Sequence, residues 1–224
     1  MRTLAVVALK GGSGKTTVAT HLALAAHLRG LDTLVADIDP QHSASDVLSG
    51  RREPGPPCVA SSGAEVMATQ FAAIGLRKQL LIIDTQAGAL EDASEALVLA
   101  DFAVLVVRPT LLDLAGLART VGLVRRLGKE SAVVVNQAPI AREGIEPPLM
   151  KRAFRALEFM RVPVAPVVLR SRAIYQTALE TGRSAEEMGD RTAAREIAAL
   201  WEFIQAAAEI RTKAPEATDL RAGA

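Results

Sequence analysis

The amino-acid sequence predicts a single α/β domain in which a doubly wound, mostly parallel sheet is flanked by helices. The main observation is that short apolar runs alternate along the whole chain with longer segments of helical periodicity. The composition agrees, because half of the 224 residues are hydrophobic and 23% are charged, an ordinary balance for a globular protein. A chain of this length also has room for one domain with a substantial core.

The expected strands are short runs, several of them continuously apolar, as is typical of parallel strands that are buried on both faces. They cover residues 3–9, 33–37, 58–61, 80–84, 102–108, 132–136 and 162–168. Helices are expected between them, because apolar residues there recur at helical spacing or because prolines suit a first helical turn. They cover residues 15–29, 91–99, 111–127, 147–160 and 192–211.

Two segments are expected to lie outside this framework. Residues 51–57 contain three prolines and are predicted to form a surface loop. Residues 212–224 have too few apolar side chains to pack, so we expect a domain over residues 1–211 and a disordered tail after it.

The sequence also bears on where the protein is located. No apolar run approaches the ~18 residues that a membrane-spanning helix needs. The single cysteine, Cys58, fits a reducing compartment, and a cytoplasmic protein is therefore expected.

A phosphate-binding loop is predicted between the first strand and the first helix. Residues 10–17 read Lys-Gly-Gly-Ser-Gly-Lys-Thr-Thr, and glycines let a backbone wrap closely around phosphates so that N–H groups face the negative charge. Lys15 is expected to reach the β- and γ-phosphates, and the Thr16 hydroxyl is expected to bind Mg²⁺. The predicted nucleotide-binding residues of the loop are Gly11, Gly12, Ser13, Gly14, Lys15, Thr16 and Thr17.

Other interpretations of this loop fit less well. The strict P-loop pattern, G-x-x-x-x-G-K-[ST], fails at its first glycine, where the chain has Leu9. A dinucleotide fingerprint would use Gly12, Gly14 and Asp37, but Thr17 stands where its third glycine should be. A glycine-rich turn with two solvated lysines would not explain why the run follows a strand and opens a helix.

The loop and four later segments resemble the ParA/MinD family of deviant Walker A ATPases. Residues 10–17 match the family's loop with its additional first lysine, and residues 37–41 (Asp-Ile-Asp-Pro-Gln) resemble its D-x-D-P-Q switch I. Residues 80–85 resemble its Walker B strand, and residues 133–136 resemble the strand that ends in an adenine-contacting asparagine. Residues 170–182 resemble its C-terminal pattern. The resemblance implies a P-loop NTPase fold of the SIMIBI class.

The resemblance also implies a role for each motif. Two ATP molecules are sandwiched between the subunits of this family, and the first lysine of the loop, here Lys10, reaches the partner's nucleotide. A cation beside the γ-phosphate stabilises the charge of the transferred group. Lys10, Lys15 and Asp39 are thus the expected catalytic residues, and Asp39 is expected to position the attacking water. The expected cofactors are ATP and Mg²⁺, with the metal held by Thr16, Asp37, Asp39 and Asp84.

Two further parts of the site are predicted: the residues that contact the nucleotide base, and switch II. Asn136 is expected to contact adenine, and Pro166 lies where the family's loop packs near the base. No acidic residue occurs in residues 136–139, unlike the guanine-reading motif of GTPases, and this favours adenine. In switch II the family has a proline after Asp-x, whereas this chain has Gln86-Ala87. Gln86 either orients water or is a tolerated replacement, and slow, partner-stimulated hydrolysis is expected.

The charge is distributed unevenly along the chain. The net charge is +1, but residues 119–172 carry 11 basic and 4 acidic side chains. A basic, aromatic-poor surface suits contacts with the phosphates of duplex DNA rather than base reading, although a solvated helix face is the alternative for any single arginine. Relatives of this type bind DNA non-specifically as ATP dimers. The expected DNA-contacting residues are Lys151, Arg152, Arg155, Arg170 and Arg172.

Three functional classes remain open at this point. The expected one is a nucleoid-associated homodimeric ATPase that binds DNA non-specifically and positions a plasmid, a chromosome region or a protein cluster such as a chemotaxis array. Its partner would be a ParB-like or other cargo adaptor. A loop that begins at residue 10 leaves no room for a preceding helix-turn-helix, so operator-specific repression is not expected.

The other two classes lack support in the sequence. A MinD-like membrane switch would need a basic amphipathic helix near the C-terminus, and residues 214–224 are too polar and too small for one, so no stable membrane anchor is expected. A small-molecule ATP-dependent enzyme on the same scaffold would need a second catalytic constellation, and none is visible. An iron–sulfur relative would need paired cysteines, whereas the chain has one.

Overall fold

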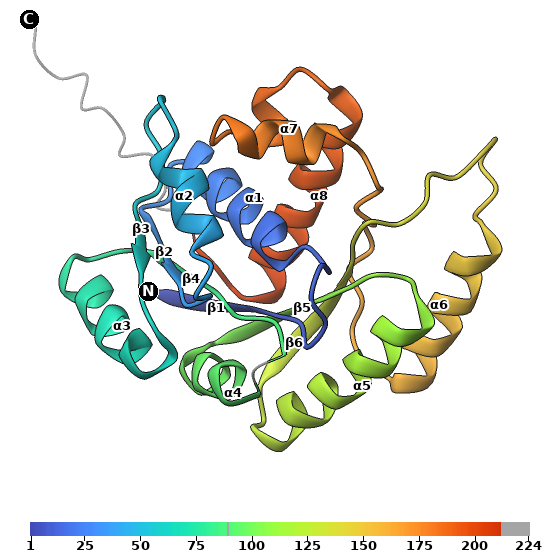
Figure 1. Ribbon diagram of the computed structural model, residues 1–224, viewed down its shortest axis with the longest axis horizontal. Helices are drawn as coiled ribbons and strands as arrows, with labels where there is room; N and C mark the ends of the chain where they lie inside the picture. The colour runs from blue at the N-terminus through green and yellow to red at the C-terminus, as the bar shows by residue number, and fades with distance from the viewer. Residues whose placement is uncertain (89, 212–224) are drawn as a thin grey trace, which may run out of the picture.

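Within the described residues, 1–88 and 90–211, six strands form one sheet at the centre of the computed structural model (Figure 1). The strands are β1 (Arg2–Val7), β2 (Thr33–Asp37), β3 (Cys58–Ala60), β4 (Leu80–Asp84), β5 (Phe102–Val107) and β6 (Glu130–Val135). Their order across the sheet is β3-β2-β4-β1-β5-β6, and every neighbouring pair is parallel. The predicted fold class is confirmed, with a sheet that is wholly parallel.

Helices cover both faces of this sheet (Figure 1). On one face lie α1 (Lys15–Leu28), α2 (Ser43–Ser49), α7 (Ile174–Glu180) and α8 (Arg191–Ala207). On the other face lie α3 (Val66–Gly75), α4 (Leu90–Leu99), α5 (Leu111–Arg126) and α6 (Pro148–Met160). Short 3₁₀ turns are formed by η1 (Gly63–Glu65) and η2 (Ala185–Glu187). No helix in the described part of the chain is both long enough and apolar enough to cross a membrane.

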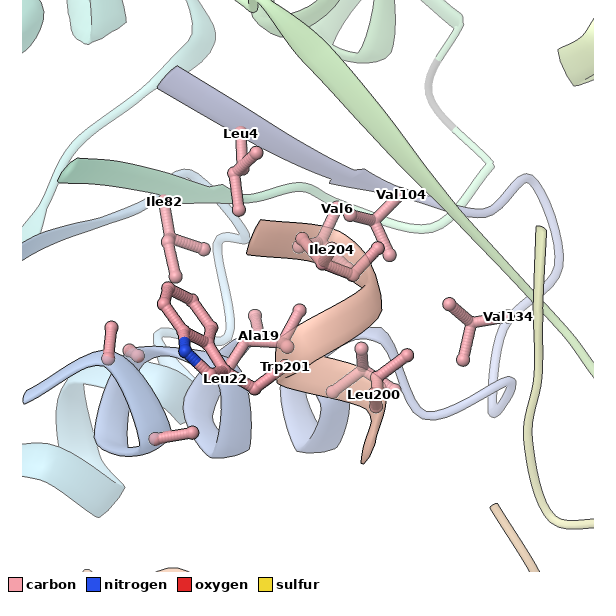
Figure 2. Packing of buried hydrophobic residues seen from close by; sticks show 14 of the residues in the cluster. Leu4, Val6, Ala19, Leu22, Ile82, Val104, Val134, Leu200, Trp201 and Ile204 are labelled. Atoms are coloured by element: carbon pink, nitrogen blue, oxygen red, sulfur yellow. The ribbon is translucent and has the colours of Figure 1, made fainter. Parts of the chain in front are cut away.

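The core has two layers because each buried strand presents alternate side chains to opposite faces of the sheet. In the layer beneath α1 and α8, Trp201 and Ile204 of α8 meet Leu22 of α1 under the strands that carry Leu4 and Val104 (Figure 2). All five side chains are at most 4% exposed. The C-terminal helix α8 therefore belongs to the same core as the phosphate-loop helix α1.

The segment at residues 162–168 corrects one predicted strand. It runs alongside β6, with Ala165 donating to the carbonyl of Val133 and Leu169 donating to that of Val135, but only an isolated bridge joins it to the sheet. Pro163 and Pro166 remove two backbone donors from this segment, and a regular ladder needs those donors. It is therefore an extended edge segment rather than a seventh strand.

The loop at residues 51–57 is a loop as expected, but its first residue is not a surface side chain. The Arg51 guanidinium is 3% exposed, and it forms an ion pair of 2.8 Å with Glu187 and donates to the carbonyl of Gly182. The loop is thereby attached to the α7–α8 region. The tail predicted at residues 212–224 lies outside the described residues.

Candidate nucleotide site

The phosphate loop joins the end of β1 to the start of α1, as predicted. Gly12 and Gly14 adopt φ angles of +73° and +85°, in the left-handed region that glycine enters without strain. Gly14 is the N-cap of α1 and no side chain caps the helix, so its first N–H groups are available to an anion. The side-chain amide of Asn136, directly after β6, donates a hydrogen bond to the carbonyl of Ser13 in the loop at 2.8 Å.

Lys15 is the buried lysine of the loop, with 6% of its surface exposed. Burial lowers its pKa, while the nearby carboxylates of Asp84 and Asp39 raise it. An ammonium that sits between acidic groups and a helix N-terminus is suitably placed to neutralise phosphate oxygens. The position of Lys15 beside Asp84 and Asp39 is compatible with a contact to the β- and γ-phosphates, and that contact stays a prediction.

Asp37 and Asp84 end the adjacent strands β2 and β4 and are direct partners in the sheet register. Asp37 accepts backbone N–H groups from Asp39 at 3.2 Å and from Ser45 at 2.9 Å. Each oxygen of its carboxylate therefore already accepts one backbone N–H, from switch I and from α2 respectively. Burial raises the pKa of Asp37, and these two hydrogen bonds counteract the rise.

Asp84 is different, because both of its buried carboxylate oxygens lack a hydrogen bond of standard geometry to the described residues. Burial raises its pKa to about 7, and the nearby Thr16 hydroxyl and Lys15 counteract the rise. A buried carboxylate without a partner is costly unless a cation or ordered water satisfies it. The donor set of Asp84 and Thr16 fits Mg²⁺, which typically takes one or two protein oxygens and completes its shell with phosphate and water.

Within residues 1–88 and 90–211, no three His, Cys, Asp or Glu side chains converge as a self-sufficient metal cluster. A metal at this edge would therefore depend on the nucleotide for part of its ligand shell, and it would neutralise charge on the phosphates.

The two other predicted residues near the phosphates, Asp39 and Gln86 of switch II, are both half-buried. The carboxylate of Asp39 accepts the N–H of Gln41 at 2.9 Å.

Lys10 has a different environment from Lys15, although the two lysines belong to one loop. It is exposed, and its aliphatic chain lies beside Gly116 of α5, where an added Cβ would come within 3.5 Å of the lysine Cγ. The Lys10 side chain therefore occupies the outer rim of the site.

Two residues that hold the loop were not predicted from the sequence. Arg108, directly after β5, pairs with Asp113 at 2.9 Å and donates to the carbonyl of Gly11 at 3.4 Å. Gln137 donates to the carbonyl of Gly12 at 3.0 Å. Near Arg108 the sequence indicates only a helix start: Thr110 caps α5 by accepting the N–H of Asp113, which is the Thr-x-x-acid pattern. This pattern does not indicate a contact with the phosphate loop.

On the base side, the two predicted residues occupy different environments. Asn136 is 4% exposed and contacts the phosphate loop. Pro166 is exposed and lies in the extended segment beside β6. The prediction that Pro166 approaches a base stays a prediction.

The five predicted DNA contacts fall into two groups. Lys151, Arg152 and Arg155 are exposed on α6. In contrast, the two arginines after the extended segment are engaged within the protein: Arg170 forms an ion pair with Glu146, and Arg172 pairs with Glu196 at 2.9 Å. These ion pairs were not foreseen, and they leave both guanidinium groups less available to a phosphate than the prediction assumed.

The chain matches the model of the CobQ/CobB/MinD/ParA nucleotide binding domain over residues 4–184. The protein belongs to this family. Among its relatives, maintenance of carboxysome distribution protein A of Halothiobacillus neapolitanus is 30% identical over 207 residues, which cover 87% of this chain and 92% of that protein. The resemblance to ParA and MinD that was predicted from the motifs is confirmed.

Solved structures of ParA/MinD-type proteins share the fold. The ATP complex of McdA from Cyanothece superimposes with a TM-score of 0.78 and 19% identity, covering 96% of this chain and 98% of that one. MinD of Pyrococcus horikoshii, complexed with Mg-ADP, gives a TM-score of 0.73 and 20% identity, covering 95% and 99%. The P-loop NTPase fold is therefore confirmed, and the nucleotide complexes of these neighbours agree with ATP and Mg²⁺ as the cofactors of the site.

Proposed function

We propose that this protein is a switch ATPase that dimerises on binding ATP, binds duplex DNA non-specifically in that state and positions cargo on the nucleoid. The observation that carries this proposal is the separation of the two lysines in one loop. Lys15 is buried among the site's own carboxylates, whereas Lys10 stands exposed at the rim. A rim cation is suited to a nucleotide that a second subunit presents.

The proposed chemistry assigns one task to each side chain. Lys15 neutralises the β- and γ-phosphates, and Mg²⁺ held by Thr16 and Asp84 lowers the charge of the triphosphate. Asp39 positions the attacking water. The partner's Lys10 then stabilises the charge that develops on the transferred group. Hydrolysis needs that second cation and is slow even in the dimer, so the ATP state persists until an adaptor protein stimulates hydrolysis.

The exposed face of α6 is the proposed DNA surface. Lys151, Arg152 and Arg155 lie within two helical turns, and none of them forms an ion pair with the described residues. Cations without a protein partner are available to duplex phosphates, and such binding is non-specific and sensitive to salt. Because Arg170 and Arg172 are already paired, we assign them at most a minor share of this contact.

The relative from Halothiobacillus neapolitanus is named for the maintenance of carboxysome distribution. This name supports a large protein assembly as the cargo, in preference to a plasmid or a chromosome region. A cargo-bound adaptor protein is the proposed partner, and it would release the ATPase from DNA by stimulating hydrolysis.

The test is a gel-shift titration of arbitrary duplex DNA with and without ATP, accompanied by light scattering to follow dimerisation. We expect ATP to produce both the dimer and the shift, and binding to fall steeply with salt. Replacing Lys151, Arg152 and Arg155 by Gln should weaken DNA binding by about tenfold or more and reduce the salt slope by up to ~3.

The matched control replaces Arg191 and Arg195, two exposed arginines of α8 on the opposite face of the sheet, by Gln. This variant should bind DNA like the wild type. The proposal fails if ATP binds but changes neither the oligomeric state nor DNA binding. The assignment of the surface fails if the α6 variant and the control variant weaken DNA binding equally.

A further inference from the structure

Glu196 of α8 accepts hydrogen bonds from three residues of the segment 170–175, which comprises a loop and the start of α7. Its Oε2 accepts the backbone N–H of Arg170 at 2.9 Å and the hydroxyl of Tyr175 at 2.6 Å. Its Oε1 accepts from Nε and Nη2 of Arg172 at 3.1 and 2.9 Å. The side chain is 13% exposed. A carboxylate with this many donors, one of them charged, fixes the conformation of the segment that supplies them.

That segment is joined directly to the strand end that carries Asn136. Arg170 forms a parallel bridge with Ala138, and Ser171 donates its N–H to the Ala138 carbonyl at 2.7 Å. The N–H of Ala138 is in turn donated to Leu169 at 3.1 Å. Asn136 lies two residues earlier and donates its own N–H to the carbonyl of Val107 in β5 at 2.8 Å. The loop that Glu196 anchors therefore holds the chain immediately after Asn136.

A second arm of the same network reaches the helix of the phosphate loop. The Tyr175 ring packs edge-to-face on His21 of α1, with ring centroids 5.4 Å apart. His21 donates from Nδ1 to the carbonyl of Thr17 at 2.8 Å, in the first turn of α1. Glu196 is thus also connected, through Tyr175 and His21, to the first turn of the helix that follows the phosphate loop.

We propose that Glu196 is a positioning residue that holds the base-contacting segment, residues 136–138, in register with the phosphate loop. It acts through the loop at residues 169–172 and does not touch the nucleotide. The inference rests on the proposed function, because it assumes that a base lies against Asn136. Loss of Glu196 should therefore weaken recognition of the base while leaving the cradle for the phosphates in place.

Calorimetric titrations of the full chain with Mg-ATP and with magnesium tripolyphosphate separate these two contributions. In Glu196→Gln, which keeps the shape but loses the charge, we expect ATP to bind about tenfold more weakly, as when a charged hydrogen-bond network loses one partner. Binding of tripolyphosphate should stay unchanged. Tyr175→Phe, which keeps the ring on His21 and removes one donor, should produce a smaller loss of the same selective kind.

The matched control is Glu186→Gln. Glu186 also forms an ion pair with an arginine, Arg29, at 2.8 Å, and its side chain is 15% exposed. Within the described residues it has no hydrogen bond to the loop at residues 169–172. This variant should bind both ligands like the wild type. The inference is overturned if Glu196→Gln and Tyr175→Phe weaken ATP and tripolyphosphate equally, or weaken neither. If the wild type itself binds ATP no more tightly than tripolyphosphate, the proposed base site fails, and the inference fails with it.

Discussion

The conformation of the phosphate loop depends on a single glycine, Gly14, which is the N-cap of α1. Gly14 has a φ of +85°, and a Cβ added to it would lie 2.2 Å from Nδ2 of Asn136. An alanine there would strain the backbone and displace the amide that contacts the loop. The cradle and the base side would be disturbed by one methyl group.

We therefore predict that Gly14→Ala lowers the melting temperature and weakens ATP binding by more than about tenfold. Gly75→Ala is the control, because an added Cβ at that glycine meets no atom within 4 Å and its φ is not in the left-handed region. Thermal unfolding and calorimetry check both variants. Unaltered ATP affinity in Gly14→Ala would show that the loop does not have the described conformation when nucleotide binds.

His21 is the second residue whose environment makes a measurable prediction. It is fully buried, and burial lowers its pKa to about 4 from 6.5. The folded state thus binds fewer protons than the unfolded state between these two values, so the contribution of His21 to stability is lost as the pH falls from 6.5 towards 4. The full effect is about 3 kcal/mol.

Asp84 changes stability in the opposite direction, because its pKa is raised to about 7 and the folded state binds an extra proton below that pH. The comparison of wild type with His21→Leu isolates the histidine. Urea unfolding at pH 7, 5.5 and 4.5 should show the wild type losing more stability on acidification than the variant. Parallel pH dependences would mean that His21 is accessible to protons in the folded state.

Residue-scale features of the site were predictable only where the chemistry is local in sequence. Lys15 and the glycines form one short run after a strand, and that run by itself predicts a phosphate loop. The contacts of Arg108 and Gln137 with that loop join residues 97 and 125 positions apart. Nothing in the sequence near either residue indicates which carbonyl it will contact, because the sheet order brings them together.

At the scale of elements, strands that are buried on both faces were the easiest to predict. β2 and β4 have the predicted bounds, because each is a continuous apolar run that ends in an aspartate. Helix α3 was missed, because its exposed face carries Met67, Phe71 and Ile74 and so shows no clear division into apolar and polar sides. The short helices α2 and α7 have seven residues each, too few for a periodic pattern to show.

For residues 162–168, beside β6, the predicted position along the sheet is confirmed, but the predicted element type, a strand, is wrong. The apolar residues of this segment predicted a strand, and it does lie along the sheet, but its prolines prevent a regular ladder. The outcome matters for the site, because this segment leads into the loop that Glu196 anchors. Separate backbone hydrogen bonds, rather than a regular ladder, hold this segment to β6. The residues that follow it are held in addition by hydrogen bonds to the Glu196 side chain.

In the whole molecule, the net charge is nearly zero, but the charged side chains are grouped in different places. The carboxylates and Lys15 lie at the carboxyl edge of the sheet, and the unpaired cations of α6 lie on one of its helical faces. In the proposed ATP-bound dimer each subunit would contribute one such face, and doubling the number of cations strengthens binding to a polyanion. Under this proposal, DNA binding should require ATP.

The most direct test of the central claim is a mixing experiment that asks whether Lys10 acts on its own nucleotide or on its partner's. Lys10→Ala and Asp39→Ala are each expected to have almost no ATPase activity. In a mixed dimer, the site on the Lys10→Ala subunit keeps its own Asp39 and receives the partner's Lys10, so one complete site is restored. Steady-state ATPase assays of an equal mixture should recover roughly a quarter of the wild-type activity, as random pairing into two-fold dimers predicts. A mixture that stays as inactive as its two components would contradict the account.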